Sequence, residues 1–208
     1  MTITKETRER IAKTLVGLDT FYLALGQFVA QFSETEALIQ TVFWELAGIQ
    51  SPTAQAVFSG VRTDDAMGKI TRIADAQKWS LSAKNKKDFI FGQLKHINKL
   101  RNNILHYGAQ LEGPDTWKVT NENFVHVPEN ISSEVISPQI LQAARNDLDT
   151  IELLLIDLIL INGPHEQAAR DAIDEALKTS WQYKPPPQAG RRRKNRDRTP
   201  KRKHRPAS

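Results

Sequence analysis

The chain of 208 residues contains no cysteine. This absence excludes disulfide bonds, thiol nucleophiles, cysteine-ligated zinc and iron–sulfur clusters. Long apolar runs are also missing, because the longest, residues 153–161, is interrupted by Asp157 and is too short to cross a bilayer. The polar N-terminus lacks the apolar segment of a signal peptide. We therefore expect a cytoplasmic protein that does not enter a membrane.

Charge is distributed unevenly along the chain, whose formal net charge is +5. Residues 182–208 contain eleven Lys or Arg and one acid, Asp197, for a net charge of +10, whereas 18 basic and 23 acidic residues give the rest −5. The basic segment also holds five of the ten prolines and almost no apolar side chains. Such a composition cannot bury enough apolar surface to offset the entropy of ordering. We expect a folded domain over residues 1–181 and a disordered tail over 182–208.

The basic tail favours a polyanionic partner, because clustered Lys and Arg bind phosphates with a strong salt dependence. Nucleic acid is the partner that we favour, and a purely solubilising or localising appendage is the alternative. The tail residues that we expect to contact RNA are Arg191, Arg192, Arg193, Lys194, Lys201, Arg202 and Lys203.

The body of the chain has the periodicity of helices. Apolar residues recur three or four apart over residues 21–46, 67–79, 89–105 and 140–159, and the last of these runs is apolar on most sides. Ser51-Pro52, Thr63, Ser82, Ser137-Pro138 and Pro164 are helix starts, and Gly108 is a helix end. Residues 109–137 differ, and their alternation predicts two short strands, 117–120 and 124–127. The predicted fold is an all-α helical bundle, with a core over residues 20–162 and a small β-hairpin or loop insertion over 109–137.

Several common active-site motifs are absent. Residues 60–69 do not form a phosphate-binding loop, because Thr63 stands where that motif needs glycine and Ile70 where it needs a hydroxyl. The chain contains no G-x-S-x-G or H-E-x-x-H sequence. Two acidic clusters have the chemistry of a divalent metal site, but we favour solvated helix faces for both: Asp147, Asp149 and Glu152, and Asp171, Asp174 and Glu175. We expect no metal and no cofactor.

One motif stands out in residues 100–108, at the end of the fourth helical run. At 100° per residue, a single polar stripe contains Lys95, Asn98, Lys99, Asn102 and His106. Arg101 lies about 140° from His106, beside the apolar edge of the helix. An arginine in that position is costly unless it faces a cleft or meets an anion.

These residues supply the groups that RNA backbone cleavage requires. Histidine, with a reference pKa of about 6.5, can remove the proton of a ribose 2′-hydroxyl near neutral pH. Arginine can stabilise the pentavalent phosphorane through two parallel hydrogen bonds. We therefore expect His106 and Arg101 to be catalytic, Asn102 to orient them, and Lys95 and Lys99 to contact RNA.

Arg101-Asn102-x-x-x-His106 resembles the R-x4–6-H motif of HEPN domains (higher eukaryotes and prokaryotes nucleotide-binding), in which Asn commonly follows the Arg. The similarity covers roughly residues 20–162 and includes the segments 32–36 and 58–60. It implies a helical bundle that dimerises so that two motifs face each other across one cleft. It also implies a metal-independent endoribonuclease, acting in a toxin–antitoxin, phage-defence or RNA-processing setting, with an antitoxin or other regulatory protein as a further partner.

Three hypotheses therefore stand beside one another. The first is the HEPN-type endoribonuclease. The second is a non-catalytic HEPN-type dimer that binds RNA or nucleotide in the same cleft. The third is a protein-interaction module that its tail tethers to nucleic acid or an anionic membrane. In a purely structural interpretation, Arg101 and His106 only bind helix-end carbonyls or pair with acids of a neighbouring helix.

Overall fold

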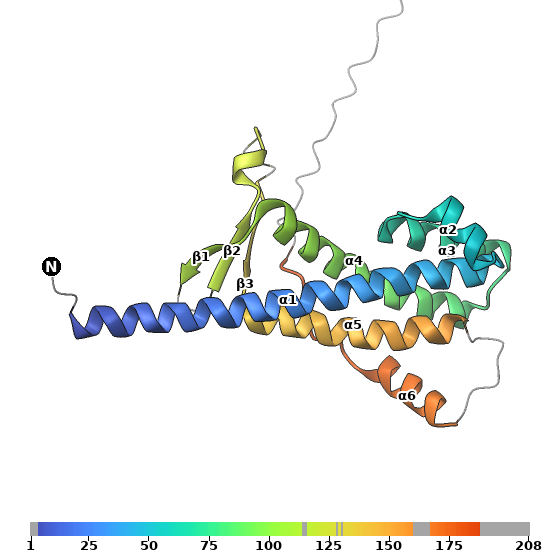
Figure 1. Cartoon of the computed structure of the whole chain (residues 1–208). Coiled ribbons are helices and arrows are strands. Elements are labelled where there is room, and N and C mark those ends of the chain that lie inside the picture. Colours follow the sequence, from blue (N-terminus) through green and yellow to red (C-terminus); the bar gives the residue numbers. More distant parts are fainter. Residues whose placement is uncertain (1–3, 114–115, 128, 130, 160–166, 188–208) are drawn as a thin grey trace, which may run out of the picture.

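The computed structural model describes residues 4–113, 116–127, 129, 131–159 and 167–187. These form a mostly helical protein with a small antiparallel sheet (Figure 1), which confirms the predicted fold class at that level. The elements, in chain order, are α1 (Lys5–Ala47), α2 (Ser51–Phe58), α3 (Thr63–Ala76), α4 (Leu81–Tyr107), β1 (Gln110–Gly113), β2 (Thr116–Thr120), the short 3₁₀ helix η1 (Glu122–Phe124), β3 (Ser133–Ile136), α5 (Pro138–Ile159) and α6 (Gln167–Lys178).

Helix α1 extends along most of the molecule and lies side by side with α5 (Figure 1). It begins earlier than the predicted Phe21, because Thr4 caps its N-terminus by accepting a hydrogen bond from the Thr7 N–H. Phe21, Phe28 and Phe32 are fully buried along one face. The first turns of α1 project past the rest of the described fold (Figure 1), and among the described side chains Leu18 is the first of the helix that packs against the core.

One stretch of α1 is, by length and composition alone, apolar enough to cross a membrane. From the sequence alone, no membrane-crossing segment is expected, because the longest apolar run is short. In a helix of 43 residues, apolar side chains that are separated in the sequence can still raise the mean hydropathy of a long stretch. Of that stretch, 22% is buried inside the described fold, and the core includes Phe21, Phe28 and Phe32 of the same helix.

Helix α4 presents the motif. Ser80 caps its start by accepting from the Ala83 N–H, and Ile90, Leu94 and Ile97 hold it against the core. It ends at Gly108, whose φ of 72° and ψ of 173° suit glycine almost exclusively. The predicted helix end at Gly108 is confirmed.

The insertion contains a three-stranded antiparallel sheet in the order β1-β2-β3. Trp117 on β2 pairs with Ile136 on β3, and its ring stacks on Phe21 of α1 with centroids 3.9 Å apart. The predicted strand at 117–120 is confirmed, and the predicted strand at 124–127 is wrong. The Ser132 N–H donates to Asn121 Oδ1, and the Asn121 N–H donates to the Ser132 carbonyl. A longer loop, which includes η1, therefore joins β2 to β3.

The prediction that disorder begins at residue 182 is wrong for residues 182–187. Residues 181–187, which we call the C-terminal strap, lie against α4 and α5. The Trp181 ring stacks on Phe89 with centroids 4.5 Å apart, and Tyr183 is 3% exposed. The Tyr183 ring supplies apolar burial that the overall composition of the tail conceals, and Trp181, just before the tail, adds a second ring contact. The predicted RNA-binding residues of the tail, 191–203, lie outside the described residues.

Candidate functional site: a polar cavity at the end of α4

The three motif residues line one cavity of about 400 Å³. Arg101, Asn102 and His106 extend from α4, and Asn98 joins them one turn earlier. The opposite wall comes from Glu36 of α1 and from the segment that begins α3, which contributes Arg62, Thr63 and Asp64. The fold therefore brings together a histidine, two arginines, two amides and two carboxylates from three separate elements.

Arg101 is held in place but keeps hydrogen-bonding capacity. Its guanidinium lies over the Phe32 ring, 5.2 Å from the centroid, and Nη1 donates to Asn102 Oδ1 at 3.0 Å. The Nε atom is buried and makes no hydrogen bond within the part of the chain that the structure describes. The guanidinium also lines the cavity, so an anion there can form charge-assisted hydrogen bonds with it.

Asn102 Oδ1 accepts that Nη1 hydrogen bond and so restricts the guanidinium from one side. The Phe32 ring restricts the guanidinium from the other side, because a cation is attracted to an aromatic face. An arginine held by a ring and an amide is pre-organised to bind phosphate, and it loses little rotamer entropy when it does so.

His106 occupies the last turn of α4 and has an exposed side chain at the cavity. The free carbonyl groups of a helix end favour a positive charge nearby. Because the imidazole is open to solvent, it is accessible to a substrate that enters from outside. Among the described residues, no ion pair joins His106 to an acid of a neighbouring helix, as the purely structural interpretation requires.

The wall opposite α4 contains the start of α3. Thr63, the first residue of α3 and 2% exposed, donates its hydroxyl to Glu36 Oε1 at 2.7 Å. This bond ties α3 to α1 and places Arg62 and Asp64 at the cavity. The two arginines of the lining balance its two carboxylates, so anion binding there depends on directed hydrogen bonds rather than on a large positive field.

Lys95 and Lys99 lie in an adjoining groove of about 430 Å³. This groove shares Asp64, Asn98 and Asn102 with the motif cavity, so the two lie next to each other along α4. Both lysine side chains are exposed. The lysines that we expect to contact RNA therefore lie beside the motif, on the side toward the helix start.

Sequence reasoning did not identify Glu36, Arg62, Thr63 and Asp64 as cavity residues. The segment 63–65 is a recognisable helix start, and such starts carry unpaired N–H groups and positive partial charge. That signal marks an element able to border an anion site, but nothing in the local sequence shows that α3 begins opposite the end of α4. Only the packing of α1 against α3 decides this.

Two residues of the first acidic cluster bind groups of neighbouring segments, whereas Asp171, Asp174 and Glu175 of the second are exposed. Asp147 accepts two strap N–H groups, and Glu152 Oε1 accepts from Thr35 Oγ1 and Gln31 Nε2. Within the described residues, no group of three or more His, Cys, Asp or Glu side chains is arranged to hold a metal ion.

The chain matches no family model, no curated protein and no solved structure.

Proposed function

We propose that the protein is a HEPN-type, metal-independent endoribonuclease whose active site is the cavity lined by Arg101, Asn102 and His106. The observation that supports this proposal is that the Arg101 guanidinium, held by Phe32 and Asn102, lines the same cavity as His106. A phosphate diester of RNA offers oxygens to that guanidinium, and its ribose supplies the 2′-hydroxyl on which a histidine acts.

In the proposed reaction, His106 removes the proton of the 2′-hydroxyl, and the 2′-oxygen attacks the adjacent phosphorus. Arg101 donates hydrogen bonds to the non-bridging oxygens as negative charge develops on the phosphorane. The bond from phosphorus to the 5′-oxygen then breaks, and that oxygen takes back the proton that His106 removed from the 2′-hydroxyl. The products are a 2′,3′-cyclic phosphate and a 5′-hydroxyl.

The exposed position of His106 supports a further part of the proposal, namely that two copies pair with their cavities facing each other. In a single chain the histidine is open to water, which competes for every hydrogen bond at the phosphate. A second copy over the cavity mouth excludes that water. An antitoxin or other regulatory protein that covers the same mouth is the corresponding inhibitor in this proposal.

The test is cleavage of a mixed RNA pool in EDTA by the wild-type protein and three variants. We expect His106→Ala to slow cleavage by about 10²–10⁴-fold, the usual contribution of a general acid–base. We expect Arg101→Lys to slow it by about 10²-fold, because lysine keeps the charge but loses the two-pronged hydrogen bonding.

The matched control is His126→Ala, which removes an exposed histidine outside the cavity and leaves the expected rate unchanged. Cyclic phosphate ends in the wild-type reaction establish the chemistry. Cleavage that persists in His106→Ala at the wild-type rate contradicts the proposal. Salt-sensitive RNA binding without cleavage by any form leaves the non-catalytic RNA-binding dimer as the function.

A further inference from the structure

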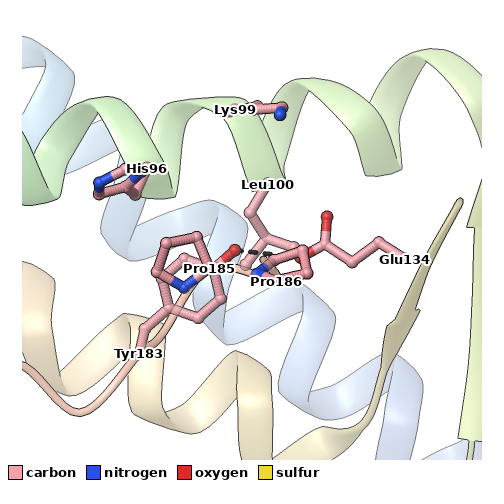
Figure 2. Close-up of a pocket in the computed structure, with 7 residues that line it drawn as sticks. All are labelled: His96, Lys99, Leu100, Glu134, Tyr183, Pro185 and Pro186. Atoms are coloured by element: carbon pink, nitrogen blue, oxygen red, sulfur yellow. Dashed lines mark hydrogen bonds between the residues drawn. The ribbon is translucent and has the colours of Figure 1, made fainter. Parts of the chain in front are cut away.

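A second cavity, of about 240 Å³, lies where the C-terminal strap passes α4 (Figure 2). Its walls come from three elements that are far apart in the sequence. They are His96, Lys99 and Leu100 of α4, Glu134 of β3, and Tyr183, Pro185 and Pro186 of the strap. Sites for drug-sized ligands measure roughly 300–1,000 Å³, so this cavity has the size for a single ring system.

The strap wall of the cavity is fixed in position. Asp147, 2% exposed, accepts from the backbone N–H of Gln182 at 2.8 Å and of Tyr183 at 2.9 Å. The buried Gln93 amide donates to Asp147 and to the carbonyl of Tyr183. These bonds satisfy the strap backbone on both sides, so the cavity is a built feature of the fold.

The lining combines flat apolar walls with one acceptor edge. Leu100, Pro185 and Pro186 present apolar surfaces, and Figure 2 shows Glu134 entering from the β3 side. The Tyr183 hydroxyl donates to Glu134 Oε1 at 3.1 Å. Burial first, and the nearby Glu134 carboxylate second, raise the pKa of Tyr183, so the hydroxyl stays protonated and keeps Glu134 in place.

The exposed side chain of Lys99 adds a positive charge beside this cavity. A cation there attracts the phosphate that accompanies a nucleotide. Apolar walls, a carboxylate edge and a neighbouring cation together match a nucleotide whose base presents hydrogen-bond donors.

We propose that this cavity is a subsite for a guanine base of single-stranded RNA, with Glu134 as the residue that selects it. An ionised carboxylate only accepts hydrogen bonds. Guanine presents two adjacent donors, N1–H and the N2 amino group, on its Watson–Crick edge, and unstacked RNA bases are read on that edge. Adenine and cytosine place a ring acceptor beside their amino group, and uracil has one N–H between two carbonyls, so all three oppose a carboxylate.

Lys99 lies between the subsite and the active site that we propose, which occupy different sides of α4. Lys99 lines both this cavity and the adjoining groove, and Asn98 and Asn102 line both that groove and the motif cavity. Lys99 and His106 are about 10 Å apart along the helix axis, from the rise of 1.5 Å per residue. This inference rests on the proposed function in that one RNA strand follows this path, with the guanosine a few nucleotides from the cleaved phosphate.

The experiment measures binding of short 2′-O-methyl oligouridines that carry one guanosine, adenosine or cytidine, by fluorescence anisotropy with the full chain. These oligonucleotides lack the 2′-hydroxyl and are not cleaved. We expect the wild type to bind the guanosine form roughly tenfold more tightly than the others, from the discrimination typical of one bidentate contact. We expect Glu134→Gln to remove this preference, because an amide offers one acceptor and one donor while still accepting from Tyr183.

The matched control is Glu112→Gln, an exposed carboxylate on β1 of the same sheet, and we expect it to keep the guanosine preference. Equal wild-type affinity for the three oligonucleotides, or a preference that survives Glu134→Gln, overturns the subsite. Parallel cleavage assays separate the two proposals. Cleavage without guanosine preference overturns only the subsite, preference without cleavage overturns only the nuclease, and no binding to any oligonucleotide overturns both.

Discussion

The attachment of the C-terminal strap depends on one buried carboxylate, and Asp147→Asn tests it. Asp147 Oδ2 accepts from Tyr183 N and Gln93 Nε2, and Oδ1 accepts from Gln182 N at 2.8 Å. An asparagine retains the shape but has one acceptor oxygen. Its better orientation keeps the two contacts at Oδ2 and turns an NH₂ group toward the Gln182 N–H.

The cost follows from these contacts. One bond to a charged acceptor is lost, worth about 1.5–3 kcal/mol, and two others weaken by about 0.5–1 kcal/mol each as they become neutral. The strap should therefore be destabilised by about 3 kcal/mol, which corresponds to roughly 100-fold faster local opening. We expect the Gln182 and Tyr183 amides to exchange with solvent deuterium faster by about that factor.

Hydrogen exchange resolved by NMR measures this opening directly. The control is Asp149→Asn, which neutralises an exposed carboxylate on the same helix and should leave both strap amides unchanged. Wild-type exchange rates in Asp147→Asn refute the assignment of Asp147 as the anchor. Because the strap also forms the guanine subsite, loss of the guanosine preference in this variant is expected as well.

Two further predictions concern the free energy of unfolding. Gly108→Ala should lower the free energy of unfolding by about 1–3 kcal/mol, because φ of 72° with ψ of 173° strains any side chain. Gly92→Ala, at an exposed position inside α4 with open space around it, should raise the free energy of unfolding by up to about 1 kcal/mol. Urea denaturation of both variants checks these opposite signs, and equal effects contradict them. The raised pKa of Tyr183 means that the unfolded state loses its phenolic proton first, so stability is fully present below about pH 10 and falls as pH rises above it. Urea midpoints on either side of that pH should fall further for the wild type than for Tyr183→Phe, and identical shifts would exclude the burial of this hydroxyl as the cause.

The helices were predictable because their signals are local. Periodic apolar residues and Gly108 at a helix end act within one or two turns. The predicted start of α4 at Ser82 is two residues late, because Ser80 is the residue that caps the helix. The long apolar stretch of α5 was likewise recognisable as buried, since Leu148, Ile151 and Leu155 are fully enclosed. The strand at 124–127 was mispredicted because its alternation is short, and the non-local pairing of β2 with β3 overrides it.

By itself the sequence determined the helical fold class, the placement of Arg101, Asn102 and His106 on one helix end, and the concentration of positive charge near the C-terminus. These depend on composition and on the 100° helical period, which require no knowledge of neighbours. The tertiary structure alone decided that Glu36 and the start of α3 face the motif, that Arg101 lies over Phe32, and that the strap passes α4 beside Glu134. Each of these contacts joins residues separated by many turns of chain, and such contacts follow from how the amphipathic faces pack rather than from any local pattern.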